Sequence, residues 1–126
     1  MTEAQFQRAV AKLLDASGLL WYHGPNEGKR NPRTGAALKA AGMKAGFPDC
    51  VIFDPPQYDA CAELLKGFKG KPRGLAIELK VGRNKPTAAQ LEWHDKLRAR
   101  GWRVEVCRTM DDVMDLLREC YPMRFA

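Results

Sequence analysis

The sequence predicts a single α/β domain over residues 1–126. Its length of 126 residues suits one domain with its own hydrophobic core. Helical periodicity alternates with short β-prone runs along the chain, which is typical of α/β proteins. The composition, 45% apolar and 29% charged, excludes a disordered chain. The expected order of elements is α-β-β-β-α-β-α.

The first element is predicted to be an amphipathic helix that ends at Gly18. Thr2 and Gln5 have the spacing of a capping box. The apolar residues that follow at helical intervals are Phe6, Val10, Leu13 and Leu14. A short strand is expected over 19–23. Residues 24–48 contain five glycines and three prolines, so they are predicted to form a long loop, and such loops usually serve function.

Two strands are predicted in the middle of the chain, over 49–53 and 75–80. Pro55 and Pro56 end the first strand, and Gly74 precedes the second. A short helix is expected between them, over 58–65.

The last third of the sequence predicts a helix, a strand and a second helix. Thr87 and Gln90 have the spacing of a capping box, and this helix should end at Gly101. Residues 102–107 alternate as a strand does, and Thr109 should cap the last helix. The residues expected on the inner stripes of these helices are Leu91, His94, Leu97, Val113, Leu116, Leu117 and Cys120.

The formal net charge of +6 is distributed unevenly. Basic segments at 23–47 and 66–85 flank an acidic segment at 48–65, which favours a polyanion partner such as nucleic acid. The sequence has neither an apolar run long enough to cross a membrane nor a secretory signal, so we expect a cytoplasmic protein without membrane contact. The four cysteines, Cys50, Cys61, Cys107 and Cys120, match no zinc or disulfide framework and are interpreted as small apolar residues.

A candidate active site is formed by Asp49, Glu78 and Lys80. Alternation along a strand places Glu78 and Lys80 on one face, and Asp49 approaches Glu78 if the two strands are neighbours. Two carboxylates with the backbone carbonyl of Leu79 would form an oxygen-rich site suited to Mg²⁺ or Mn²⁺. A glutamate and a lysine two residues apart also occur as an ordinary surface pair. Their place at the end of an apolar strand, between the basic segments, favours the catalytic interpretation.

These motifs resemble the PD-(D/E)xK nucleases and, within them, the stand-alone VRR-NUC domains. The resemblance rests on GFPDCVIF at 46–53, GLAIELK at 74–80, the Pro-Thr-x-x-Gln helix start at 86–90 and PNEGKR at 25–30. It implies a restriction-endonuclease-like core, with a mixed β-sheet flanked by helices, and metal-dependent cleavage of branched DNA. Asp49, Glu78 and Lys80 match the family motif residue by residue.

The resemblance also suggests roles for residues outside the motif. Glu3 lies where related resolvases place an additional acid, although a helix N-terminus favours an acid anyway. Gln90 matches the family glutamine, and a capping box explains it equally well. No cysteine lies at ligand spacing from His23 or His94, so zinc is not expected. The residues expected to contact DNA are Asn26, Lys29, Arg30, Lys44, Arg83 and Lys85.

The sequence therefore predicts a divalent-metal-dependent endonuclease for branched DNA, with a Holliday junction resolvase as the first choice. A homodimer is expected because a four-way junction is two-fold symmetric and needs two cuts. The alternatives are a monomeric flap or nicking endonuclease, and a DNA-binding module without catalysis.

Overall fold

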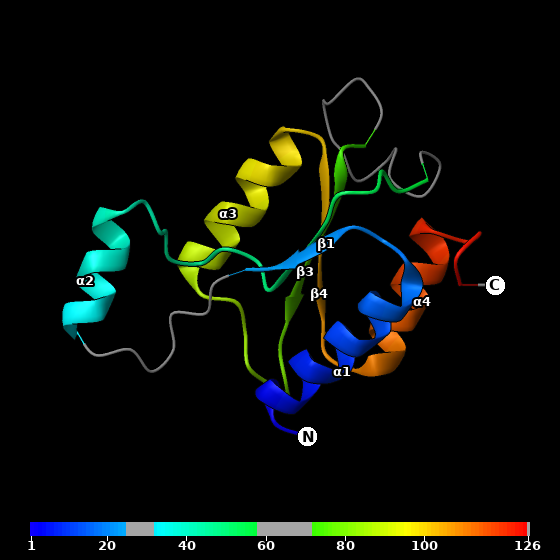
Figure 1. The fold of residues 1–126 in the computed structure, drawn as a ribbon, viewed down its shortest axis with the longest axis horizontal. Coiled ribbons are helices and arrows are strands. Elements are labelled where there is room, and N and C mark those ends of the chain that lie inside the picture. Colours follow the sequence, from blue (N-terminus) through cyan, green and yellow to red (C-terminus); the bar gives the residue numbers. More distant parts are fainter. Residues whose placement is uncertain (25–31, 58–71, 126) are drawn as a thin grey trace.

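A computed structural model describes residues 1–24, 32–57 and 72–125 (Figure 1). It contains a mixed β-sheet flanked by helices, as predicted. The elements in chain order are α1 (Glu3–Ser17), β1 (Trp21–His23), α2 (Pro32–Ala40), β2 (Cys50–Ile52), β3 (Gly74–Leu79), α3 (Ala88–Ala99), β4 (Trp102–Cys107) and α4 (Met110–Cys120). Within the described ranges, no helix is long and apolar enough to cross a membrane.

The sheet has the strand order β1-β2-β3-β4. β1 pairs with β2 and β2 with β3 in antiparallel fashion, whereas β3 and β4 are parallel. Helix α3 connects the two parallel strands, because parallel neighbours cannot be joined by a tight turn. The register places Cys50 opposite Ile77, so that Asp49, one residue before β2, lies near Glu78 on β3.

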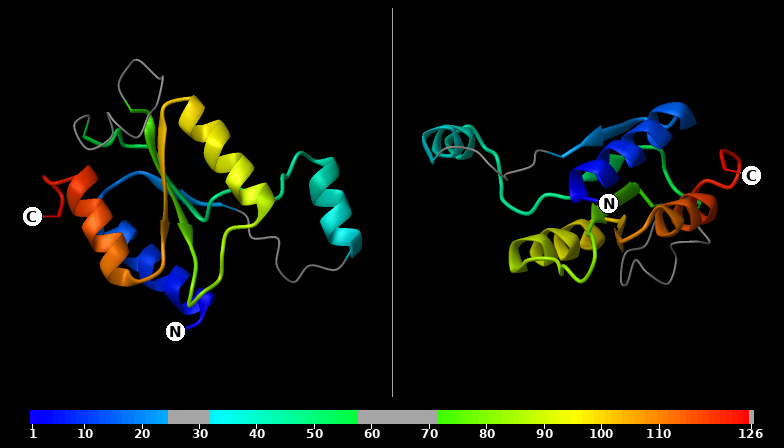
Figure 2. Two further views of the ribbon diagram at one scale, coloured as in Figure 1. Left: turned by 180° about the vertical axis from the view of Figure 1, so that it is seen from behind. Right: turned by 90° about the horizontal axis from the view of Figure 1, so that it is seen from below.

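The hydrophobic core lies between one face of the sheet and the two terminal helices. Phe6, Val10 and Leu14 of α1 are fully buried there, as are Leu75, Ile77 and Leu79 of β3. The predicted inner residues of α4 are also buried: Val113, Leu116, Leu117 and Cys120. Figure 2 shows α1 and α4 next to one another, with α3 apart from them. The second face, which carries Glu78, packs against His94 of α3.

The three predicted helix caps are confirmed. Thr2, Thr87 and Thr109 each accept a hydrogen bond from the backbone amide three residues later. The side chains of Gln5, Gln90 and Asp112 bond back to the cap residue, so all three are complete capping boxes. Gly18 ends α1 with a φ of +79°, a conformation that glycine adopts without strain.

Four details of the prediction were wrong. Residues 24–48 are not all loop, because Pro32–Ala40 form α2; proline suits a first helical turn, and the alanine-rich run that follows favours helix.

The other three corrections concern α3, β4 and β3. Leu91 is 49% exposed instead of lying on the inner stripe of α3. Strand β4 has the predicted bounds, but burial does not alternate along it, since Arg103 and Val104 are both buried; Arg103 lies 3.2 Å from Glu119 on α4. Strand β3 ends at Leu79, so Lys80 lies just beyond it.

The cysteines within the described ranges, Cys50, Cys107 and Cys120, are buried, as their interpretation as apolar residues predicts. Cys61 and the short helix expected over 58–65 lie outside the residues that the structure describes.

Candidate active site

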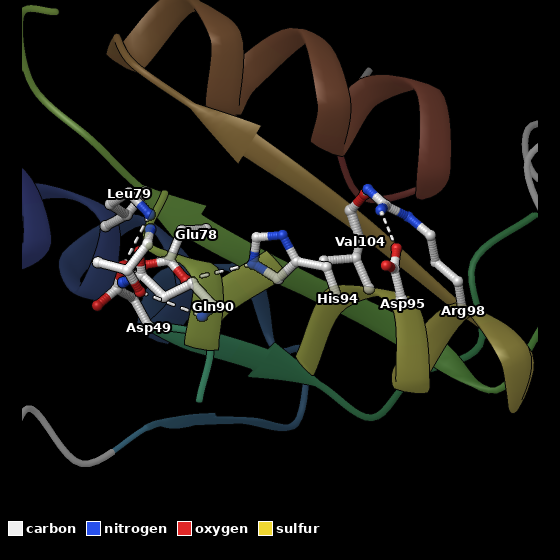
Figure 3. Close-up of polar contacts among 9 residues, drawn as sticks. Asp49, Glu78, Leu79, Gln90, His94, Asp95, Arg98 and Val104 are labelled. Atoms are coloured by element: carbon white, nitrogen blue, oxygen red, sulfur yellow. Dashed lines mark hydrogen bonds and ion pairs between the residues drawn. The ribbon is translucent and has the colours of Figure 1, made fainter. Parts of the chain in front are cut away.

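The site lies where β2 begins and β3 ends, and its centre is a pair of carboxyl groups. Asp49 directly precedes β2, and the antiparallel register of β2 with β3 places it beside Glu78, close enough for each carboxyl group to affect the pKa of the other. Asp49 Oδ2 also accepts a hydrogen bond of 2.7 Å from the backbone amide of Leu79 (Figure 3). The adjacent strands that the predicted site required are therefore present, and they bring the two acids together.

Burial governs the electrostatics of this pair. Glu78 is only 1% exposed. Burial raises the pKa of Asp49 to about 7, and the neighbouring Glu78 carboxyl group with its negative charge adds to the effect. Burial also raises the pKa of Glu78; Asp49 and the charge of Lys80 oppose this shift, while the charge of Glu3 adds to it. Two acids in this environment favour either a shared proton or a bound cation.

Hydrogen bonds to the backbone of Asp49 fix its position. The carbonyl oxygen of Asp49 accepts bonds from the Gly24 amide and from His23 Nδ1, each at 2.8 Å. Because a carbonyl only accepts, His23 carries its proton on Nδ1. The preceding loop is held against α3, where the rings of Phe47 and Trp93 meet edge to face with centroids 5.1 Å apart.

Gln90 takes part in the capping box of α3 and also contacts Glu78. Its Oε1 accepts the Thr87 amide at 2.8 Å, and its backbone amide donates to Thr87 Oγ1 at 3.2 Å. Its Nε2 donates to Glu78 Oε2 at 3.2 Å (Figure 3). The sequence left a cap and an active-site role as alternatives; in the structure one end of this amide closes the capping box and the other end contacts Glu78.

The contact between His94 and Glu78 was not predicted from the sequence. His94 Nε2 lies 3.4 Å from Glu78 Oε1, and the imidazole is buried. His94 follows Gln90 by four residues, so the two side chains lie on the same side of α3. The four-residue spacing from Gln90 could have predicted the contact with Glu78. The sequence pattern indicated a core position for His94 instead, because Leu91 and Leu97 lie three positions away on either side.

The oxygen donors at the site fit a hard divalent cation. Asp49 and Glu78 supply carboxylates. The Leu79 amide faces Asp49, and the carbonyl of a strand residue points to the same side as its amide, so that oxygen faces the site as well. In the part of the chain that the structure describes, no group of three or more His, Cys, Asp and Glu side chains is arranged to hold a metal. A cation here would rely on these two carboxylates, the carbonyl and water, as Mg²⁺ and Mn²⁺ often do.

Comparison with known proteins identifies the family. A family model described as "VRR-NUC domain" matches residues 1–111. The chain belongs to the VRR-NUC domain family. It is thus a nuclease-type domain. A solved structure titled "VRR_NUC domain protein" is 23% identical to it, with a TM-score of 0.73, and the match covers 97% of this chain and 89% of the other. That likeness confirms the α/β fold. No curated protein matches the chain.

The other predicted site residues of this VRR-NUC domain differ in how near they lie to the two acids. Lys80 and Glu3 both lie near enough to Glu78 to affect its pKa. Lys44, Arg83 and Lys85 are exposed, and the latter two lie in the turn between β3 and α3. Asn26, Lys29 and Arg30 lie outside the described residues.

Proposed function

We propose that this VRR-NUC domain is a divalent-metal-dependent, structure-specific DNA endonuclease that acts on branched DNA, as a Holliday junction resolvase and as a homodimer. The observation that carries the proposal is the pairing of β2 with β3, which places the half-buried Asp49 beside the buried Glu78. Burying two acids side by side disfavours their charged forms, so a site that served structure alone would gain by replacing one of them. A bound cation makes the pair favourable.

Asp49, Glu78 and the Leu79 carbonyl would hold Mg²⁺ or Mn²⁺. Bound there, the ion would polarise a phosphodiester and lower the pKa of a water molecule. Lys80 follows β3 directly, and its charge reaches Glu78. Its ammonium group would orient the attacking water or stabilise the charge that develops on the phosphate. Glu3, whose charge also reaches Glu78, is a candidate for an additional acid at the same site.

The charge distribution supports DNA as the substrate. Exposed Arg83 and Lys85 follow the catalytic strand within six residues, and exposed Lys44 precedes Asp49 by five. Cations on both sides of the acidic pair would contact the phosphates that flank the cleaved bond. Asn26, Lys29 and Arg30 are proposed to add contacts of the same kind.

The homodimer follows from the symmetry of the substrate. A four-way junction has two-fold symmetry, and a two-fold dimer presents two identical sites to it. A monomeric flap or nicking endonuclease is the alternative among nucleases. A DNA-binding module without catalysis is a weaker alternative, because it would not need two acids beside a surface that contacts phosphate.

The test uses labelled four-way junction, flap and linear duplex, each with Mg²⁺, Mn²⁺ or EDTA. We expect paired symmetric nicks in the junction with either metal and none in EDTA. Asp49→Asn and Glu78→Gln should abolish cleavage while binding to the junction in EDTA persists. Glu92→Gln is the matched control, because Glu92 is an exposed acid on α3 that pairs with Lys96. Cleavage at the wild-type rate in Asp49→Asn would overturn the site.

Mixing wild-type protein with Asp49→Asn tests the homodimer. A mixed dimer with one working site should nick one junction strand and leave the opposite strand intact. The alternative outcome has two parts: the protein sediments as a monomer, and the rate of paired cleavage falls only in proportion to the fraction of wild-type protein in the mixture. That outcome would favour the flap or nicking alternative.

A further inference from the structure

Two residues of α3, one helical turn apart, contact the two oxygens of Glu78 separately. Gln90 Nε2 donates to Oε2 at 3.2 Å, and His94 Nε2 lies 3.4 Å from Oε1 (Figure 3). Glu78 and His94 are each 1% exposed, so water cannot readily replace either contact. The orientation of the carboxylate therefore depends on α3.

His94 suits a carboxylate that holds a cation. A neutral ring can donate one hydrogen bond without adding a positive charge. A lysine or arginine in the same place would repel a divalent ion. Each oxygen of Glu78 retains a further acceptor position after its contact with α3.

We propose that His94 is a positioning residue that, with Gln90, orients the Glu78 carboxylate toward a divalent cation held with Asp49. This inference rests on the proposed metal-dependent function. The distance of 3.4 Å is long for a hydrogen bond, and such contacts are often long before the ligand is bound and shorten afterwards. Groups that hold a metal ligand in place are typically worth 10–100-fold in metal affinity or activity.

The test is Mn²⁺ binding to the full chain, measured by calorimetry and by the rise in Tm that Mn²⁺ produces over EDTA. His94→Leu removes the donor, and His94→Gln retains an amide nitrogen that can reach Glu78. Arg98→Leu is the control on the same helix, because Arg98 donates to the Val104 carbonyl at 2.8 Å and thereby ties α3 to β4 without touching Glu78. His94→Phe is the second donor-free variant, used if His94→Leu does not fold.

We expect Mn²⁺ affinity to fall about tenfold or more in the donor-free variant, and to stay within about threefold of wild type in His94→Gln and Arg98→Leu. Unchanged affinity in the donor-free variant would overturn the proposal. So would an equal loss in Arg98→Leu, because loosening of α3 would then explain the effect.

Asp49→Asn separates this inference from the proposed function. If wild-type protein and Asp49→Asn bind Mn²⁺ equally, the metal site itself is wrong. If Asp49→Asn loses binding and the donor-free His94 variant keeps it, only the role of His94 is wrong.

Discussion

Gln90 donates a hydrogen bond of 3.2 Å to Glu78, and the same side chain closes the capping box that begins α3. The start of the helix and the geometry of the acid pair are therefore set by one amide group. Any change that moves the first turn of α3 should also move a donor away from Glu78. Stability and activity can nevertheless be separated, because Thr87 takes part only in the cap.

Thr87→Ala and Gln90→Ala should therefore differ in activity. Thr87→Ala removes the cap hydroxyl and should cost about 1 kcal/mol of stability while retaining most cleavage. Gln90→Ala should cost a similar amount and also reduce cleavage, because Glu78 Oε2 loses its donor. Urea unfolding and junction cleavage measured on both variants check this. Equal cleavage rates in the two variants would show that the contact with Glu78 has no part in the reaction.

The acid pair should make stability depend on pH when metal is absent. The pKa of Asp49 is about 7 in the folded protein, against an ordinary value of 3.8, so the folded state binds more protons between these values. Stability in EDTA should then fall as pH rises across that window. Asp49→Asn should remove much of this slope. Each unit of pKa shift corresponds to about 1.4 kcal/mol. Between about pH 4 and pH 8, the free energy of unfolding of Asp49→Asn should therefore rise by at least that amount relative to wild type.

Urea unfolding of both proteins in EDTA at several pH values measures this difference directly. Asn can still accept the Leu79 amide, so the substitution retains that hydrogen bond. Parallel stability curves for the two proteins would mean that Asp49 titrates normally and that the acids are not electrostatically coupled.

Lys80 should matter to turnover more than to metal binding. Lys80→Ala should reduce kcat about 100-fold or more and leave the Mg²⁺ requirement nearly unchanged. Lys12→Ala is the comparison, because Lys12 is an exposed lysine on α1 with no proposed role in the site. Cleavage measured across a Mg²⁺ titration distinguishes the two. A Lys80→Ala protein that recovers the full rate at high Mg²⁺ would assign the lysine to metal affinity instead.

Local patterns were sufficient to predict strand β3 and the place of Glu78 on it. Alternation placed Glu78 on one face of β3, and the prolines after β2 marked where that strand ends. The pairing of β2 with β3 was only an assumption, because register is a tertiary property. Helix α2 was not predicted, because the many glycines and prolines over residues 24–48 indicated a loop. The alanine-rich run after Pro32 nevertheless forms a helix.

The errors in the candidate site have a common physical cause. Sequence spacing treats a side chain as serving a single role, whereas Gln90 serves the cap and Glu78 at once. His94 was assigned to the core from its spacing, and it is indeed buried. The contact of His94 with Glu78 depends on where α3 packs against the sheet. Local sequence patterns do not specify that packing.

The exposed cations beside the site should set the salt dependence of DNA binding. Replacing Arg83 and Lys85 together with alanine should weaken binding to every DNA tested. For each phosphate that the variant no longer neutralises, the slope of log K against log salt should become shallower by about 0.9. Lys12 and Arg118, exposed on α1 and α4, form the control pair. Equal slopes for the two double variants between 50 and 200 mM salt would show that the turn after β3 does not contact the backbone of DNA.

Gly46 should be essential because the loop before Asp49 touches the first turn of α3. Its φ is +87°, and a Cβ there would lie 2.6 Å from the carbonyl carbon of Ala89 and 2.7 Å from the Gln90 nitrogen. Gly46→Ala should therefore push α3 away from the loop, cost more than the roughly 1–2 kcal/mol of left-handed strain alone, and reduce cleavage by moving Gln90.

Gly42→Ala is the matched control, because Gly42 has a φ of +112° with nothing within 4 Å of its Cβ position. Gly42→Ala should lose the stability that backbone strain alone costs, and it should cleave the junction at the wild-type rate. Unfolding and junction cleavage compare the two variants, and equal losses in both would mean that backbone strain, and not the contact with α3, accounts for the glycine.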